Sequence, residues 1–245
     1  MDWFAHLATQ TPPKSASWFD MCEACGQNPK IVAQNGMKRP YCSRSCALSD
    51  CSQAAHLREV EPDDVTFADI QTKFSAGWKK EQPVLERVYK VEYPHIVIAA
   101  YLAHISKLTG SSHGCQTIQT YFASECVCGM AISGPSLCQD SSCGICQPVT
   151  SSFRTFACGE TKKVGRKGPG IYTYQEPRRA HRYATCASPS PYRVMVVCDV
   201  ALPADHRLSR SRSIFSHKAD GVMPRYILVY RTESRETSPE TASDA

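Results

Sequence analysis

The number and spacing of the cysteines constrain this sequence more than any other feature. The chain has 245 residues and 14 cysteines, a density typical of a secreted disulfide framework or of metal thiolates in a reducing compartment. The opening segment contains no continuous apolar run, so we expect no secretory signal there, and no later apolar stretch is long enough for a membrane span. We therefore expect an intracellular protein, nuclear or cytoplasmic, with reduced cysteines and no membrane contact.

The first group of cysteines lies near the N-terminus. Cys22 and Cys25 form a C-x2-C pair, and Cys42 and Cys46 form a C-x3-C pair sixteen residues later. Because each pair fits on a tight turn, four thiolates can surround one zinc ion. The segment around them has few large aliphatic side chains and therefore needs a bound metal ion to fold. The spacing predicts a zinc site; the alternative is two redox pairs or free surface thiols.

A second group of cysteines is less regular. Cys138, Cys143 and Cys146 follow a C-x4-C-x2-C pattern, and either Cys126 or Cys128 would supply a fourth ligand. We favour Cys128 because the glycine that follows it permits a tight turn. The expected site is therefore Cys128, Cys138, Cys143 and Cys146, and the alternative is a loop of reduced, partly buried thiols.

Hydrophobic periodicity indicates both helices and strands. One expected helix starts with acidic residues, and its apolar side chains recur at helical spacing at Phe67, Ile70, Phe74 and Trp78. We expect Pro83 to end this helix. The other expected elements are a strand over 87–93, a helix after Pro94 that ends at Gly110, and strands over 192–202 and 226–230. Because strand and helix do not alternate regularly, we expect an α+β fold with an antiparallel or mixed sheet and flanking helices.

Composition divides the chain further. We expect a flexible arm (1–20), a cysteine-rich zinc module (21–51), a linker and helix (52–86), a main domain (87–231) and a disordered tail (232–245). Residues 151–231 hold 15 lysines and arginines against 5 aspartates and glutamates, which leaves a charge of +10. That block suits a pyrophosphate ligand, and the alternatives are a solvated face or a nucleic-acid patch. The candidate cations are Lys162, Lys163, Arg166, Lys167, Arg178 and Arg179.

Three short motifs stand in order along the main domain. They are His113-Gly114, then Gly170-Ile171-Tyr172, and then Tyr183, eleven residues after Tyr172. Together they resemble the ADP-ribosyltransferase catalytic domain of the poly(ADP-ribose) polymerase superfamily. The resemblance covers about residues 70–231, and the segments around the motifs look like those of fungal members, some of which also carry an N-terminal cysteine motif. It implies an ADP-ribosyltransferase-like sheet fold over 87–231.

The resemblance also implies a pocket for NAD. Gly114 would hold the nicotinamide carboxamide with its backbone, and His113 would hydrogen-bond a ribose hydroxyl. Tyr183 would stack on the nicotinamide ring, and Tyr172 would line the same pocket beside His113. In this interpretation His113 and Tyr172 are catalytic, and the partners are NAD and a protein or nucleic-acid acceptor. The alternative is that the tyrosines only pack at strand ends.

The sequence departs from the family because it lacks the glutamate found in active members. Active members place a glutamate at a late strand. One alignment of this sequence puts Arg225 at that position, and the other puts Ser211 to Ser213 there. Ala180 also stands where the family commonly has a serine. The implied activity is therefore NAD-dependent transfer of single ADP-ribose units. The alternative is an inactive module that binds NAD or ADP-ribose, or a zinc-containing nucleic-acid binder. The sequence makes no prediction about the oligomeric state.

Overall fold

The structure is a computed structural model of the chain. It describes residues 20–22, 25, 27–32, 36, 38–39, 41–43, 45–46, 55–76, 78, 81–160, 163–165, 167–186, 190–207 and 213–234. The chain divides into two compact units, Met1–Gln53 with Pro94–Ala99, and Ala54–Tyr93 with Ala100–Ala245. The predicted arm, apart from Asp20, and the predicted tail beyond Ser234 lie outside the described residues.

One antiparallel sheet of eight strands forms the body of the second unit. Its strands are β1 (His56–Val60), β2 (Glu81–Glu92), β3 (Cys115–Phe122), β4 (Lys163–Gly165), β5 (Gly168–Tyr174), β6 (Arg193–Pro203), β7 (Ser213–Ser216) and β8 (Val222–Ser234). The order is β1-β2-β8-β6-β3-β5-β4, and β7 pairs with β5. The predicted α+β class with an antiparallel sheet is confirmed.

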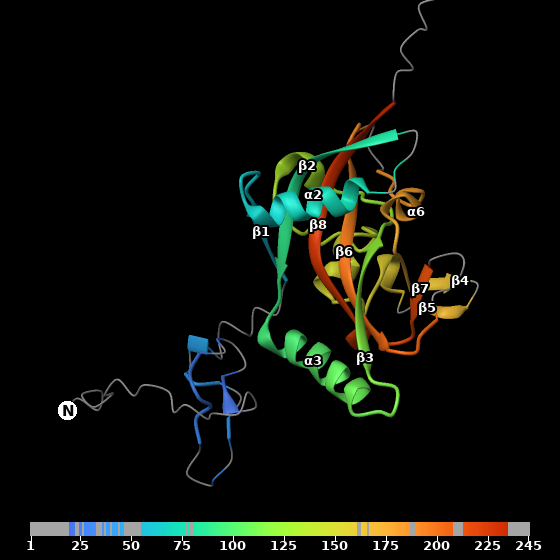
Figure 1. Cartoon of the computed structure of the whole chain (residues 1–245). Helices are drawn as coiled ribbons and strands as arrows, with labels where there is room; N and C mark the ends of the chain where they lie inside the picture. Colours follow the sequence, from blue (N-terminus) through green and yellow to red (C-terminus); the bar gives the residue numbers. More distant parts are fainter. Residues whose placement is uncertain are drawn as a thin grey trace, which may run out of the picture. The chain divides into compact units, whose positions relative to one another are not determined.

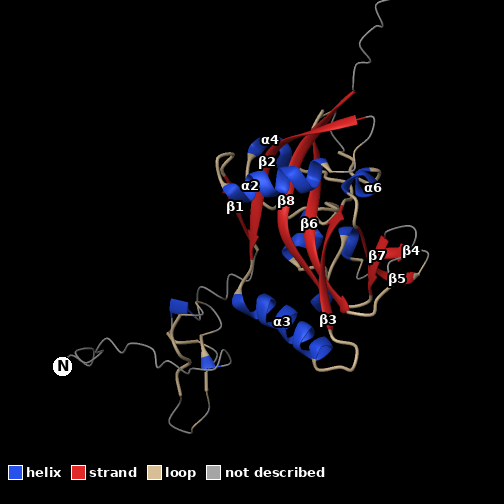
Figure 2. Ribbon diagram, viewed as in Figure 1, coloured by secondary structure: helices blue, strands red, loops and turns tan. Residues whose placement is uncertain are grey.

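The helices are few and mostly short (Figure 2). They are α2 (Val65–Ser75), α3 (His95–Thr109), α4 (Met130–Ser133), α5 (Cys146–Thr150) and α6 (Pro177–His181). Helix α3 follows Pro94 and ends before Gly110, whose N–H bonds the Ser106 carbonyl at 2.9 Å, as the sequence predicts. Of the described helices, none combines the length and the apolarity needed to cross a membrane.

Helix α2 confirms the predicted amphipathic helix. Asp64 caps its start, since its carboxylate accepts a hydrogen bond of 2.7 Å from the N–H of Thr66. Its buried face consists of Phe67, Ile70 and Phe74, and each such side chain contributes on the order of 2 kcal/mol through burial. Figure 1 shows α2 crossing one face of β2, β8 and β6. Trp78 lies just beyond the helix, and its indole N–H donates to the Phe74 carbonyl at 2.7 Å.

The two faces of the sheet carry separate hydrophobic cores. In β6, Val194 and Val196 belong to one core and Met195 and Val197 to the other, which is the period-2 alternation of a strand covered on both faces. Helix α2 covers the second of these cores, and the cysteine-rich segment covers the first. Cys198 is fully buried in the first core, as predicted for a small apolar residue.

The structure corrects three predicted boundaries. Pro83 lies inside β2 and is paired with Thr232 of β8, so it does not precede the strand. The position tolerates proline because β1 pairs only with residues 88–92 of β2, which leaves one side of β2 without a described partner strand at Pro83. The same pairing carries β8 to Ser234, three residues into the segment expected to be a disordered tail. The expected division at residues 86 and 87 also falls within β2.

Candidate functional site

A cleft of about 1030 Å³, here called the tyrosine cleft, lies where the end of β3 meets β5 and the β4–β5 hairpin. Small-molecule sites usually enclose ~300–1,000 Å³, so the size suits a ligand as large as a dinucleotide. Its described lining consists of Phe122, Ala123, Ser124, Lys163, Val164, Gly165, Lys167, Tyr172, Tyr174, Arg179, Arg182, Tyr183 and Ser213. The predicted pocket residues Tyr172 and Tyr183 therefore lie together.

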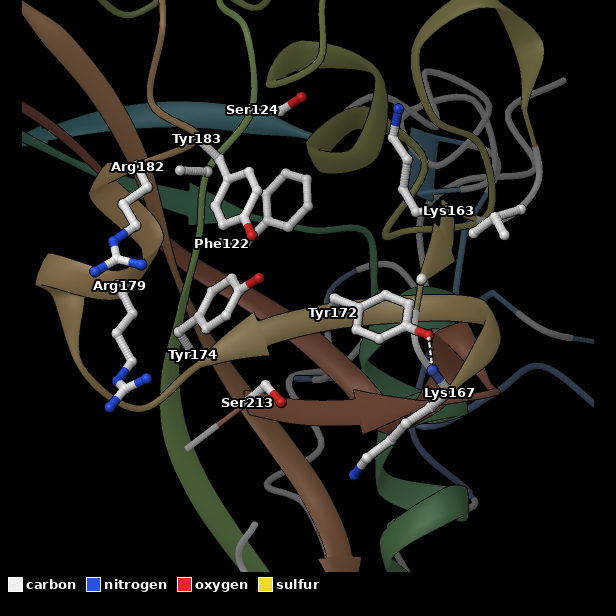
Figure 3. Close-up of a pocket in the computed structure, with 13 residues that line it drawn as sticks. Phe122, Ser124, Lys163, Lys167, Tyr172, Tyr174, Arg179, Arg182, Tyr183 and Ser213 are labelled. Carbon is white, nitrogen blue, oxygen red and sulfur yellow. Dashed lines mark hydrogen bonds between the residues drawn. The ribbon is translucent and has the colours of Figure 1, made fainter. Parts of the chain in front are cut away.

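Tyrosine rings form one wall of the cleft (Figure 3). The rings of Tyr174 and Tyr183 stack with centroids 5.5 Å apart and an interplanar angle of 13°. Tyr183 is 52% exposed, so a planar ligand can stack on its outer face. Burial, and next the neighbouring Tyr183 hydroxyl, raise the pKa of Tyr174. The Tyr174 hydroxyl therefore stays protonated at neutral pH and can donate a hydrogen bond.

The hairpin of β4 and β5 fixes Tyr172. Its hydroxyl accepts a hydrogen bond from the Lys167 N–H at 2.9 Å and donates one to the Gly168 carbonyl at 2.6 Å. Its ring lies against Phe215 of β7, with centroids 4.9 Å apart. A side chain at position 165 would meet this ring at 2.5 Å, so only glycine fits there. Tyr172 is therefore a rigid part of the wall.

Cations flank the tyrosines, and no carboxylate is among the described residues that line the cleft. Lys163 is paired with Glu160 at 3.2 Å and Arg179 with Glu176 at 2.9 Å. Lys167 and Arg182 are exposed and form no ion pair within the described part of the chain.

Of the six candidate cations, Lys163, Lys167 and Arg179 line the cleft, Arg178 does not, and Lys162 and Arg166 lie outside the described residues. The excess of positive over negative charge among the described lining residues favours an anionic ligand.

The structure does not bring His113 and Gly114 to this cleft. They precede β3, whereas the cleft begins at its far end with Phe122. Seven residues of strand lie between Gly114 and Phe122, so the two are roughly 25 Å apart at the usual rise. His113 is exposed and its Nδ1 lies 2.8 Å from a carboxylate oxygen of Asp205. The N–H of Gly114 bonds Ser111 and its carbonyl accepts from Ala204. Both backbone groups expected to hold a carboxamide are thus already used.

Phe122, Ala123 and Ser124 occupy the wall where the sequence placed the His-Gly pair. Sequence reasoning missed them because it assigned no strand to residues 115–122. The strand mixes polar and apolar side chains without clean alternation, and only its last three residues are buried. The rise in hydrophobicity over Tyr121 to Ala123 was the available signal, and the pairing of Tyr121 with Tyr174 brings that end beside the tyrosines.

The two positions considered for the family glutamate have different surroundings. Ser213 lies in β7, pairs with Tyr174 and lines the cleft. Arg225 lies in β8, where its Nε is 3.5 Å from a carboxylate oxygen of Asp199. Ala180 is fully buried in α6. The alignment that reaches the cleft therefore supplies a hydroxyl and no carboxylate at Ser213.

The first cysteine cluster comprises Cys22, Cys25, Cys42 and Cys46, whose Sγ atoms all lie within 4.8 Å of one another. Two of the separations are 3.7 Å, from Cys25 to Cys42, and 3.6 Å, from Cys42 to Cys46. Zinc bound to four thiolates at about 2.3 Å holds the sulfurs roughly 3.8 Å apart. Burial, and next the Cys22 thiol, raise the pKa of Cys42 to about 12. The group could hold a metal ion with the predicted ligands.

The second cysteine cluster comprises Cys128, Cys138, Cys143 and Cys146, again with all Sγ atoms within 4.8 Å. The Sγ of Cys128 lies 3.6 Å from that of Cys146 and 4.0 Å from that of Cys143. Hydrogen bonds from neighbouring thiols, that of Cys126 foremost, lower the pKa of Cys143 far below its usual range. Cys126 is not a member of the cluster, although its sulfur is 3.7 Å from that of Cys128. The fourth member is therefore Cys128, as predicted.

Comparison with protein-family models and with curated proteins found no match to the chain. The resemblance to the ADP-ribosyltransferase domain therefore stays a prediction.

Proposed function

We propose that the chain is a nucleotide-binding module that holds NAD or ADP-ribose in the tyrosine cleft without turning it over. The observation that carries this proposal is the composition of the cleft. Three tyrosines and four cationic side chains line it, and none of its described lining residues is a carboxylate. A ligand with an aromatic base and a pyrophosphate matches both features, since bases stack on aromatic rings and phosphates pair with lysine and arginine.

The proposed binding mode uses few residues. The base stacks on the exposed face of Tyr183, and Arg182 and Lys167 neutralise the phosphates from the two sides of the cleft. The protonated hydroxyl of Tyr174 donates to a ribose or amide oxygen. Stacking of a base on an aromatic ring contributes about 1–3 kcal/mol. The four cations make the affinity fall as salt is added.

The absence of turnover in this proposal follows from what cleavage requires. Breaking the nicotinamide–ribose bond develops positive charge on the ribose, so catalysis needs groups that stabilise that charge more than they stabilise bound NAD. Cations around the cleft would oppose such charge, and the described lining offers a serine, Ser213, in place of a carboxylate. Transfer of single ADP-ribose units to a protein or nucleic-acid acceptor stays a prediction that the same experiment tests.

The test is calorimetric titration of the full chain with NAD, ADP-ribose and nicotinamide, followed by analysis of the recovered NAD. We expect NAD and ADP-ribose to bind, with affinity that falls with salt, and NAD to be recovered intact. Tyr183→Ala should weaken ADP-ribose binding at least about tenfold, whereas Tyr183→Phe should bind nearly as the wild type. Arg182→Ala should weaken binding and flatten the salt dependence. Lys107→Ala, at the exposed end of α3, is the matched control.

Other outcomes separate the alternatives. Release of nicotinamide with label transfer from NAD to the chain or an added acceptor would support the transferase prediction over a binding module. Tight, salt-dependent binding of an RNA oligomer that ADP-ribose does not displace would support the nucleic-acid alternative. Failure of the wild-type chain to bind NAD or ADP-ribose would refute the proposal.

We also propose that the ion held by both cysteine clusters is zinc. Four thiolates in tetrahedral spacing are the ligand set that zinc occupies in structural sites, with no open position for catalysis. Two equivalents of zinc per chain are expected by elemental analysis, and one equivalent would restrict the proposal to one cluster. In this assignment the metal supports structure and takes no part in binding NAD.

A further inference from the structure

The second cysteine cluster adjoins the wall of the tyrosine cleft at one point of close packing. Gly144 lies buried between the cluster residues Cys143 and Cys146. A Cβ at this position would lie 2.3 Å from the Oγ and 2.8 Å from the Cβ of Ser124, which lines the cleft. The N–H of Gly144 also donates to the Glu125 carbonyl at 2.9 Å. The loop that carries the cysteines and the cleft wall at Ser124 therefore have to fit each other.

A second connection leads from the same loop to the tyrosine wall. The N–H of Cys126 donates to the Thr185 carbonyl at 2.8 Å, and Cys126 forms a parallel bridge with Cys186. Thr185 follows the stacking residue Tyr183 by two positions. The sulfur of Cys126 contacts that of Cys128, a member of the cluster, at 3.7 Å. The serine side of the cleft is thus hydrogen-bonded directly to the cluster loop, through Gly144 and Glu125, and the tyrosine side is hydrogen-bonded to Cys126, whose sulfur contacts a cluster member.

We propose that metal binding at the second cysteine cluster sets the shape of the tyrosine cleft, so that the metal and the cleft ligand bind with positive cooperativity. This inference rests on the proposed function for its ligand. With a metal bound, the four sulfurs fix the backbone from Cys143 to Cys146, and Gly144 then fixes Ser124 by contact. Without a metal, nothing joins the four sulfurs to one another, and the loop loses that constraint. Reciprocity requires that the ligand also tighten metal binding by the same factor.

Gly144→Ala tests the contact while keeping every cysteine. Its methyl group has to displace Ser124, so we expect zinc content to stay at the wild-type value and the Kd for ADP-ribose to rise at least about fivefold, the lower end of typical coupling. The matched control is Gly110→Ala, because a Cβ there meets only two backbone oxygens, at 3.4 and 4.0 Å, which is ordinary contact. An unchanged Kd in Gly144→Ala would overturn the proposed role of this contact.

Cys138→Ser tests the metal itself, because Cys138 is one of the two cluster members that are only partly buried, so that its replacement disturbs the core little. We expect it to lose one zinc equivalent and weaken ADP-ribose binding, and we expect faster amide exchange over residues 122–126 and 183–186. Cys42→Ser is the control, since it should also lose one zinc equivalent but leave both the Kd and this exchange unchanged. Equal effects of the two variants would overturn the inference.

Amide exchange keeps this test separate from the proposed function. If the wild-type chain binds no ADP-ribose, the proposed function fails, and the exchange of residues 122–126 and 183–186 with and without zinc still decides the linkage. Slower exchange of those residues in the zinc-loaded chain supports it. Identical exchange in the loaded and the chelated chain refutes it.

Discussion

The two cysteine clusters have the same ligand chemistry and opposite surroundings. In the first, Cys22 is the only buried residue among the described part of residues 20–46. In the second, Cys143 and Cys146 are fully buried in a core with Ile145, Val149 and Phe156. The metal would therefore be the core of the first region, whereas in the second it adds to a core that exists without it. Similar spacing of ligands can thus serve two different structural needs.

The largest expected effect is that of metal removal on the first region. A chelator should unfold residues 20–46, because structural zinc contributes roughly 10–16 kcal/mol in small domains and the described residues of this segment form no hydrophobic core that replaces it. The sheet of the second unit should survive, since its two hydrophobic cores remain. Amide exchange resolved by segment measures both the loss of protection in residues 20–46 and the retained protection of the sheet. Equal protection of residues 20–46 before and after chelation would break the comparison.

The next effect concerns the core around the second cluster. Phe156→Ala should destabilise the second unit by about 3–5 kcal/mol, because its fully buried ring packs near Phe122 and Phe153 and the cavity cannot close. Denaturant unfolding measures this change, with zinc content determined in parallel. A loss of zinc together with little loss of stability would mean that the metal and not the apolar core carries this region.

Loss of one ligand should then distinguish the two clusters. Cys143→Ser should lower the stability of the second unit by about 2–3 kcal/mol, since it leaves a buried hydroxyl among sulfurs. Cys42→Ser should leave the unfolding of that unit unchanged, because Cys42 belongs to the other unit. Thermal unfolding of the two variants, followed by the far-ultraviolet circular dichroism of the β-sheet, compares their stabilities. A similar decrease in both variants would contradict the independence of the two regions.

The smallest expected effect is at the fifth thiol of the second region. Cys126→Ala should cost about 1 kcal/mol through the lost packing of a buried sulfur and leave the zinc content unchanged, because Cys126 lies outside the four-cysteine group. The parallel variant Cys128→Ala should lose one zinc equivalent. Elemental analysis of the two proteins decides which cysteine is the ligand, and zinc loss in Cys126→Ala alone would reverse the assignment.

Local spacing predicted the features that depend on local contacts. The buried face of α2 follows from Phe67, Ile70 and Phe74, and both cysteine clusters follow from short intervals between ligands. The clustering of Tyr172 with Tyr183 also agrees with the sequence interpretation.

The predictions that failed concern features that depend on contacts with residues distant in the sequence. Pro83 lies within a strand because its partner, Thr232, is almost 150 residues away in β8. His113 is far from the tyrosines because β3, which was not predicted, intervenes with its whole length. No pattern within residues 115–122 indicates that β6 and β5 will flank them, since that pairing is set by the assembled sheet.

The position of β8 has a consequence for how the protein is made. This strand comes last among the described elements, yet it lies between β2 and β6 in the middle of the sheet. During synthesis the edges of β2 and β6 that it joins therefore stay unpaired until residues 222–234 have left the ribosome. Such exposed edges readily pair with other chains. We therefore expect the sheet to complete its folding late, with these two edges open to aggregation until β8 pairs with them.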